Sequence, residues 1–226
     1  MGRLAVVLGS NATGPRGSEI VSAAAEHGAA VVQRHGGSGE SYRLPHEIDH
    51  AGNLGPLAEQ GCDRVLAIAS VGSLRAELPV GSFVCPDDFI ALGVGLTSLN
   101  GARAHITPGF DRDWRREVVE TWQETEPPLR DGGVYWQTTG PRFETPAEIR
   151  LLAAHADLVG MTVGAECTIA AELGLAYAAV CVVDNLANGI GPQPLSVAEL
   201  EAAREANAVR LRDALAAVLT RLGALG

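Results

Sequence analysis

The chain has 226 residues, of which 46% are hydrophobic and 19% are charged, and its formal net charge is −10 at pH 7. This length and balance predict a single domain over residues 1–226 with a buried core. The acidic excess argues against a nucleic-acid or anionic-membrane partner, because both are bound through clustered lysine and arginine. No segment approaches the ~20 uninterrupted apolar residues that a membrane span needs.

The cysteines and the first residues of the chain predict a cytoplasmic protein. No CxxC spacing is present and the cysteines stand in apolar surroundings, which favours buried free thiols in a reducing compartment. The chain runs from Met1 directly into an apolar segment without a signal-peptide cleavage pattern. The cysteines are Cys62, Cys85, Cys167 and Cys181.

Short apolar runs alternate with amphipathic segments along the whole chain. The run at 4–8 stops at Gly9-Ser10 and is typical of a buried strand, whereas Ser18 and Ser196 stand where helix caps are preferred. This alternation predicts an α/β fold, with a mixed twisted sheet and helices on both faces. In chain order we expect strand 4–8, helix 18–28, strand 29–33, helix 45–60, strands 64–69, 82–85 and 89–92, an exposed loop over 93–108, helix 113–124, strand 134–138, helix 144–155, strand 158–160, helix 165–173, strand 176–183 and helix 196–222.

Glycine and polar residues follow several of these strands. Ligands of such sheets bind where strands end in loops, so a binding site is expected there. Taken singly, each loop is ambiguous. Gly9-Ser10 lacks the P-loop and dinucleotide glycine patterns and suits a plain turn equally well. Arg34-His35-Gly36-Gly37 suits an anion site or a solvated turn, and Asp184-Asn185 suits a ligand contact or a helix cap. The loops are Gly9-Ser10, 70–73, 140–144, Met161-Thr162 and 184–189.

Taken together, the loops resemble a known family. Their residues and order are similar to those of the trimeric purine nucleoside phosphorylases and 5'-methylthioadenosine phosphorylases, from about Leu4 to the last predicted helix. The GPRFET and GMT segments are the most specific part of the likeness. The matching segments are Gly9-Ser10, Arg34-His35-Gly36, Pro45-His46, Gly72-Ser73-Leu74, Gly140-Pro141-Arg142-Phe143-Glu144-Thr145 and Gly160-Met161-Thr162.

The resemblance implies phosphorolysis of a purine nucleoside to the free base and a pentose 1-phosphate. Phosphate is then the co-substrate, and no metal or organic cofactor is expected. A phosphate anion needs several donors around it, and the resemblance gives this role to Ser10, Arg34, Ser70 and Thr162. Catalysis is expected to rest on positioning and hydrogen bonding around an oxocarbenium-like sugar.

The resemblance also implies how the nucleoside is held. Met161 is expected to support the ribose, and Phe143 to pack against the purine. Glu144 matches a position that accepts a hydrogen bond from N1–H of a 6-oxopurine, where methylthioadenosine enzymes carry a small hydroxyl residue. Counting without a gap from Met161 places Asn185 at the purine-contacting position that stabilises the leaving base.

The register at Asn185 decides which base is expected. Asn185 can donate to N7 and O6 of a 6-oxopurine, whereas a slip of one residue would put Asp184 in the site and favour adenine, as in methylthioadenosine phosphorylases. The register without a gap favours inosine, guanosine or 5'-methylthioinosine as the substrate. Glu144 indicates the same preference.

Two further positions concern the 5' substituent and the neighbouring subunit. Val197 matches a position that is apolar in enzymes holding a 5'-methylthio group, although a core-facing valine is an almost equal reading. His105 lies in the long loop at the place where a neighbouring subunit of the family reaches over the sugar, although a lone loop histidine is more often solvated. A homotrimer is therefore expected.

The sequence departs from the family between Ser10 and the loop after Arg34. The stretch between these residues is short, and no histidine follows Arg34 at the family's phosphate-binding spacing. Glu40 in that loop would repel phosphate, so either Arg43, His35 or a backbone turn replaces the histidine, or the affinity for phosphate is reduced. Two alternatives stay open: a nucleoside hydrolase, and a nucleoside-binding protein without catalysis.

Overall fold

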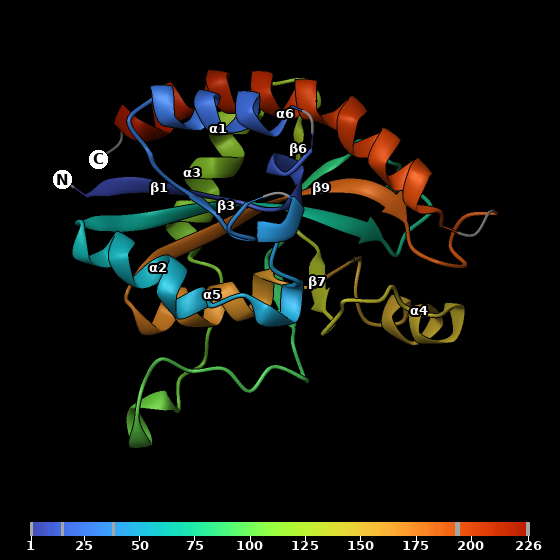
Figure 1. Cartoon of the computed structure of the whole chain (residues 1–226), viewed down its shortest axis with the longest axis horizontal. Coiled ribbons are helices and arrows are strands. Elements are labelled where there is room, and N and C mark those ends of the chain that lie inside the picture. The colour runs from blue at the N-terminus through green and yellow to red at the C-terminus, as the bar shows by residue number, and fades with distance from the viewer. Residues whose placement is uncertain (1, 15, 38, 193–194, 225–226) are drawn as a thin grey trace.

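The structure, a computed structural model, describes residues 2–14, 16–37, 39–192 and 195–224. Its strands are joined by helices that pack against the sheet (Figure 1). The strands are β1 (Arg3–Leu8), β2 (Ala30–Gln33), β3 (Cys62–Ser73), β4 (Phe83–Cys85), β5 (Asp88–Ile90), β6 (Leu129–Asp131), β7 (Val134–Gln137), β8 (Leu158–Gly160) and β9 (Ala176–Leu186). The helices are α1 (Gly17–Glu26), α2 (His50–Glu59), α3 (Arg112–Trp122), α4 (Pro146–Ala153), α5 (Val163–Glu172) and α6 (Val197–Ala224), with short 3-10 turns at Ser10–Ala12, Gly39–Ser41, Pro45–Glu47 and Gly101–Ala104.

The sheet combines a parallel centre with antiparallel additions. Strands β2, β1, β3 and β9 lie parallel in that order, and β3 pairs with β9 along almost its whole length. On one side β4 joins β9 antiparallel and carries β6; on the other, β8 joins β3 antiparallel and carries β7 and β5. The predicted mixed sheet is confirmed.

The edge of β3 changes its partner halfway along. Strand β1 follows β3 as far as the pair Leu8↔Ile68, and β8 pairs only from Gly72↔Val159 onward. Between Ile68 and Gly72, no strand of the described ranges pairs with this edge. Ser70 lies in that interval, beside the turn that follows β1, where the Gly9 amide donates to the Ile68 carbonyl at 3.0 Å.

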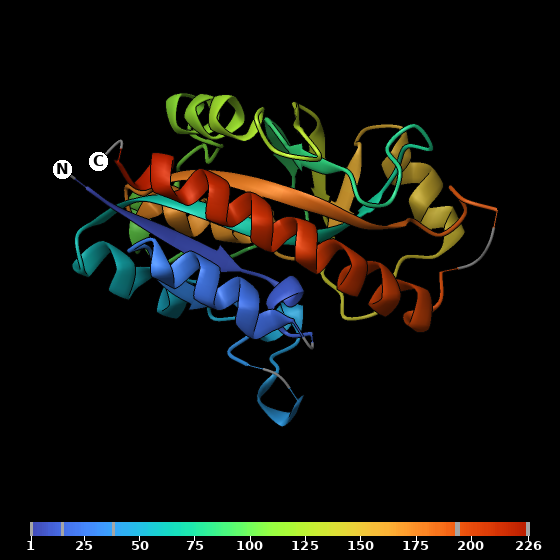
Figure 2. The same ribbon diagram turned by 90° about the horizontal axis from the view of Figure 1, so that it is seen from above.

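Two apolar cores, one on each face of the sheet, hold the helices. Helices α1, α3 and α6 pack on one face through side chains such as Ile20, Trp122 and Leu215, all fully buried. Helices α2 and α5 pack on the other through side chains such as Leu54 and Ile169. Figure 2 shows α6 lying along the sheet with α1 beside it. Burial on both faces explains the continuous apolar sequences of β3 and β9 and confirms the predicted helices on both faces.

Several element boundaries differ from the prediction. The segment 70–73 continues β3 rather than forming a loop, and β9 extends past 183 to Leu186. The predicted helix 45–60 begins only at His50, because Asp49 caps it by accepting the Gly52 amide hydrogen bond at 2.8 Å. Strand β6 (Leu129–Asp131) was not predicted.

The predicted helix 144–155 also begins later, at Pro146. Thr145 and Glu148 form a reciprocal capping box, in which each side chain accepts a hydrogen bond from the other residue's backbone amide. This cap leaves Glu144 in the preceding loop, free of helical geometry.

The long loop predicted over 93–108 is confirmed as exposed and projects away from the sheet (Figure 1). Thr97 and Ser98 are anchored to Glu172 of α5 by hydrogen bonds of 2.6–2.7 Å, whereas His105 is exposed.

Two further expectations concern the state of the cysteines and the presence of a membrane-spanning helix. All four cysteines are buried free thiols, as predicted. Among the described residues, no helix combines the length and apolarity required to cross a membrane.

Candidate active site

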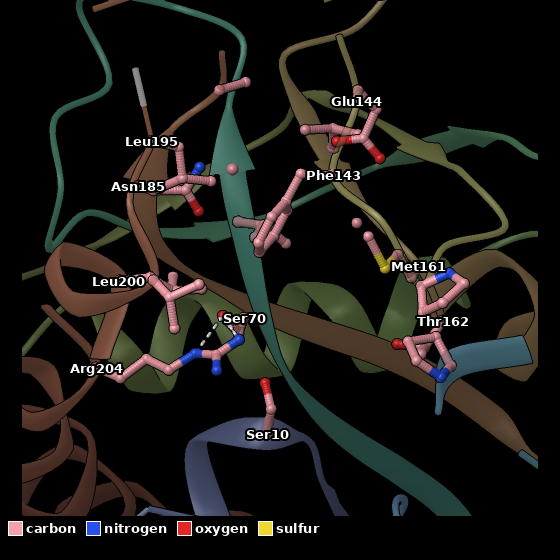
Figure 3. Close-up of a pocket in the computed structure, with 18 of the residues that line it drawn as sticks. Ser10, Ser70, Phe143, Glu144, Met161, Thr162, Asn185, Leu195, Leu200 and Arg204 are labelled. Carbon is pink, nitrogen blue, oxygen red and sulfur yellow. Dashed lines mark hydrogen bonds between the residues drawn. The ribbon is translucent and has the colours of Figure 1, made fainter. Parts of the chain in front are cut away.

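A cavity of about 280 Å³ opens where the edge of β3 changes its partner (Figure 3). Its walls come from the turn after β1, the loop after β2, the last part of β3, the loop before α4, the junction of β8 with α5, the end of β9 and the first turns of α6. Segments far apart in the chain therefore meet at one place, as the strand-end rule predicted.

Most of the side chains predicted for the site line this cavity. Those that do are Ser10, Arg34, Ser70, Phe143, Glu144, Met161, Thr162, Asn185 and Val197. Asp184 and His105 are not part of the lining. Within the described ranges, no group of three or more acidic, histidine or cysteine side chains is arranged to hold a metal ion.

One end of the cavity is rich in hydroxyl groups. Ser10 and Ser70 lie close together in Figure 3, and Thr162 lines the same cavity as the N-cap of α5. The hydroxyls of Ser10 and Thr162 donate to no side chain or backbone group of the described residues. The positive end of the α5 dipole adds to the attraction that this end has for an anion.

Arg34 closes this end of the cavity, but its charge is already paired. Its Nε and Nη2 donate to the two carboxylate oxygens of Glu166 at 2.6 and 2.8 Å, and Nη1 donates to the Ile68 carbonyl at 3.2 Å. Burial alone disfavours both charges, yet each ion stabilises the other, so the pKa of Arg34 is raised and that of Glu166 is lowered. Tyr177 also donates to Glu166, at 2.8 Å. The positive charge of Arg34, which was predicted to bind phosphate, is therefore balanced by the buried carboxylate of Glu166.

The loop after Arg34 contributes a neutral histidine. His35 lines the cavity, stacks on Tyr42 with ring centroids 4.5 Å apart, and bonds through Nδ1 to the Arg43 carbonyl at 2.8 Å. A carbonyl only accepts, so Nδ1 carries the proton and Nε2 presents a lone pair. Burial lowers the pKa of His35 to about 4. Arg43 is exposed outside the cavity, and the side chain of Glu40 lies outside the described residues.

The opposite end of the cavity carries carboxylate and amide groups. Glu144 is 9% exposed, and one of its oxygens accepts from the Thr138 hydroxyl at 2.6 Å. Asn188 donates to the Glu144 carbonyl at 2.9 Å and accepts from the Leu195 amide at 3.0 Å, so it ties this loop to the segment before α6. Phe143 stands between the two ends in Figure 3.

Asn185 and Asp184 point to different places, because successive side chains of β9 alternate between faces. Asn185 lines the cavity, and its Nδ2 would lie 3.1 Å from a Cβ added at Gly72, which makes glycine important there. Asp184 is 1% exposed and accepts from Asn207 at 2.8 Å and from Asn11 at 3.2 Å. The cavity therefore receives Asn185, as the register without a gap implies, and Asp184 supports the wall behind it.

Apolar side chains form the middle of the cavity. Met161 lies against Gly140, whose φ is +67° and whose added Cβ would come within 2.6 Å of the Met161 sulfur. Only glycine suits both this conformation and this close approach. Val197, Leu195 and Leu200 form a second apolar wall where α6 begins.

Sequence reasoning missed Arg204, Asn188 and Tyr42, which also line the cavity. Arg204 left a readable signal, because Val197, Leu200 and Arg204 are spaced three and four residues apart, which puts them on one face of a helix. Asn188 lies in the segment 184–189 that was expected near a ligand, but nothing in the sequence distinguishes it from its neighbours.

Comparison with known proteins identifies the family. The model of the phosphorylase superfamily matches residues 10–220. The chain is 45% identical over 178 residues to a probable 6-oxopurine nucleoside phosphorylase of Archaeoglobus fulgidus, covering 78% of this chain and 72% of the relative. It is 38% identical over 161 residues to the S-methyl-5'-thioadenosine phosphorylase of Pyrococcus furiosus, covering 69% and 62%.

Solved structures share the fold at lower identity. Methylthioadenosine phosphorylase from Schistosoma mansoni in complex with adenine superposes with a TM-score of 0.81 at 20% identity, covering 99% of this chain and 93% of that one. The family match over nearly the whole chain and the identity to these relatives lead to one conclusion: the chain belongs to the phosphorylase superfamily, among relatives that are named as nucleoside phosphorylases.

Proposed function

We propose that this enzyme cleaves the N-glycosidic bond of a purine nucleoside with inorganic phosphate, releasing the free base and a pentose 1-phosphate. The observation that carries the proposal is the division of the cavity into a hydroxyl-rich end, an apolar middle and an end with carboxylate and amide groups. These three parts suit a phosphate, a pentose and a purine in the order in which they react. Relatives named as nucleoside phosphorylases support the same reaction.

The chemistry follows from this arrangement. Phosphate, held by Ser10, Ser70 and Thr162 beside Arg34, is the nucleophile at C1' and also stabilises the positive charge that develops on the sugar. Met161 supports the pentose. Asn185 donates a hydrogen bond to the departing purine and so stabilises the negative charge that develops on the base. The enzyme contributes position and preorganised hydrogen bonds, and phosphate is the only co-substrate.

We assign the base preference to 6-oxopurines. Glu144 keeps one oxygen bonded to Thr138, which fixes the carboxylate, and the other can accept from N1–H of hypoxanthine or guanine. Adenine has a lone pair at N1 instead of a hydrogen, so two hydrogen-bond acceptors, N1 and the Glu144 oxygen, would face each other. A buried polar group left without a partner costs about 1–3 kcal/mol.

The apolar wall favours a particular 5' substituent within this class. Leu195, Val197 and Leu200 offer no hydrogen bond to a 5'-hydroxyl, whereas a methylthio group buries apolar surface against them. We therefore expect 5'-methylthioinosine to be used at least as well as inosine. Similarity to a probable S-methyl-5'-thioinosine phosphorylase of Methanosarcina acetivorans, 37% identical over 184 residues, supports this second candidate.

A panel of purified nucleosides with and without phosphate tests the proposal. Inosine, methylthioinosine, adenosine and methylthioadenosine are compared by kcat/KM, and pentose 1-phosphate is measured as product. Base release at an equal rate in phosphate-free buffer would identify a hydrolase, and binding without turnover would identify a nucleoside-binding protein.

We further propose a cytoplasmic homotrimer in which His105 of one subunit reaches the cavity of the next. The projecting loop and the exposure of His105, away from its own cavity, support this arrangement. A fully active monomer in light scattering would refute it.

A further inference from the structure

The phosphate end of the cavity needs a cation that Arg34 does not fully supply. Arg34 is 1% exposed and its fork is occupied by Glu166, which is 0% exposed. The pair is therefore nearly neutral as a unit when seen from the cavity. A phosphate anion transferred from water into a partly buried site needs compensating charge as well as hydroxyl donors.

The loop after Arg34 does not provide that charge. His35 is neutral with its Nδ1 proton bonded to the Arg43 carbonyl, and its free ring nitrogen is an acceptor. A lone pair supplies no positive charge and repels a deprotonated phosphate oxygen. The Arg43 side chain is exposed away from the cavity.

Arg204 of α6 brings a second guanidinium to the same place. Its Nε and Nη2 both lie 3.4 Å from the Ser70 hydroxyl, and Figure 3 shows the side chain between Leu200 and Ser10, directed at Ser70. These contacts are long for hydrogen bonds to a hydroxyl, so the donors remain available to a stronger acceptor. The side chain is 32% exposed and can meet a ligand in the cavity.

The carboxylate nearest to Arg204 is largely engaged with other groups. Asp184 Oδ2 forms an ion pair with Arg204 Nε at 3.8 Å, beyond hydrogen-bond distance, and the two Asp184 oxygens accept hydrogen bonds from the amides of Asn11 and Asn207. Arg204 therefore differs from Arg34 in its hydrogen bonds: the Arg34 guanidinium is held by a bidentate carboxylate, whereas Asp184 lies beyond hydrogen-bond distance of Arg204. Asp184 attracts the Arg204 guanidinium toward Ser70 without forming a hydrogen bond to it.

Resting on the proposed function, we propose that Arg204 is the principal cation that binds the phosphate co-substrate, together with the hydroxyls of Ser10 and Ser70. The planar fork of a guanidinium fits two phosphate oxygens at once, which a lysine cannot reproduce. On this proposal, one face of α6 serves both ends of the substrate. Arg204 binds the phosphate, and Val197 and Leu200 form the apolar wall against the 5' substituent.

The test compares Arg204→Gln and Arg204→Lys with Arg210→Gln, an exposed arginine of the same helix outside the cavity. In phosphorolysis, Arg204→Gln should raise the KM for phosphate on the order of ten-fold or more, the effect of a lost charged hydrogen bond, while the KM for nucleoside stays near that of the wild type. Arg204→Lys should give an intermediate value, because it keeps the charge and loses the fork. Arg210→Gln should behave as the wild type.

A binding measurement separates this inference from the proposed function. Inorganic phosphate should raise the Tm of the nucleoside-free wild type, and this rise should shrink in Arg204→Gln but not in Arg210→Gln. An unchanged phosphate KM and an unchanged rise in Tm in Arg204→Gln would overturn the role of Arg204. Base release without phosphate would overturn the proposed reaction instead, and the Tm measurement would still report on phosphate binding by Arg204. If Arg204→Gln did not fold, Arg204→Lys would carry the same comparison.

Discussion

Breaking the Arg34–Glu166 pair should destabilise the protein strongly, because both charges are buried. Arg34 is 1% and Glu166 0% exposed, and their two hydrogen bonds are 2.6 and 2.8 Å long. Glu166→Gln keeps the shape but leaves the guanidinium as an uncompensated buried charge. Removal of one partner of such a pair costs about 3–5 kcal/mol, a large fraction of the roughly 5–15 kcal/mol that stabilises a typical domain.

A double-mutant cycle separates the pair from its surroundings. Arg34→Met should destabilise the protein by a similar amount, because it leaves the Glu166 carboxylate buried without its cation. The double variant Arg34→Met/Glu166→Gln should cost clearly less than the sum of the two single changes, since no unpaired charge remains. The exposed pair of Arg116 and Asp113 on α3 provides the control, and Arg116→Gln should leave stability unchanged within error.

Urea unfolding followed by tryptophan fluorescence measures these changes, with equal m-values as the check that the two-state treatment holds. Additive single changes would refute the reasoning, because they would mean that the two charges do not compensate each other. A Glu166→Gln variant as stable as Arg116→Gln would refute it equally.

The remaining predictions concern the base, the register and pH. Glu144→Gln should reduce the preference for inosine over adenosine in kcat/KM by roughly one to two powers of ten, since an amide can donate to N1 of adenine; an unchanged ratio would remove Glu144 from base recognition. Asn185→Asp should shift kcat/KM toward adenosine, whereas Asp184→Asn should lower stability or phosphate affinity without changing the base, and the opposite pattern would mean that the register is wrong by one residue. Burial lowers the pKa of His35 from 6.5 to about 4, so as the pH drops through that range the unfolded chain takes up the proton before the folded one and the free energy of unfolding should fall. His35→Asn lacks this group, so its urea midpoint should fall less than that of the wild type over the same range; midpoints that fall in parallel would contradict the prediction.

The sequence predicted the architecture well because its strands are apolar on both faces. Strands buried between two helical layers read as uninterrupted apolar runs, and the runs at 4–8, 64–69 and 176–183 lie in β1, β3 and β9. The ends of β3 and β9 were missed because Ser70, Gly72 and Asn185 are polar or glycine. All three line the cavity, so local composition indicated a loop where the strand pairing in fact continues.

Helix starts were misplaced for a related reason. Pro45 and Glu144 stand before segments of helical composition, but the caps at Asp49 and Thr145 fix the first turns further along the chain. A cap is a hydrogen bond to a specific amide, and several polar residues near each start satisfy the same sequence pattern. Only the geometry selects one of them, and for Glu144 this selection decides whether the side chain lies on a helix or reaches the cavity.

The electrostatics of the phosphate end were beyond the reach of sequence reasoning, because charge compensation there depends on residues far apart in the chain. Glu166 is 132 positions from Arg34, and Arg204 is 134 positions from Ser70. A local pattern identifies Arg34 as a cation in a loop after a strand, but it carries no information about the carboxylate that α5 places against it. Whether an arginine binds a ligand or completes a buried ion pair depends on which acceptor lies within hydrogen-bond distance of its guanidinium. In this fold Glu166 reaches Arg34, whereas the carboxylate nearest Arg204 is engaged with two amides and lies beyond hydrogen-bond distance. Arg204, which the sequence pattern did not single out, is consequently the arginine whose guanidinium lines the cavity without a bidentate carboxylate partner.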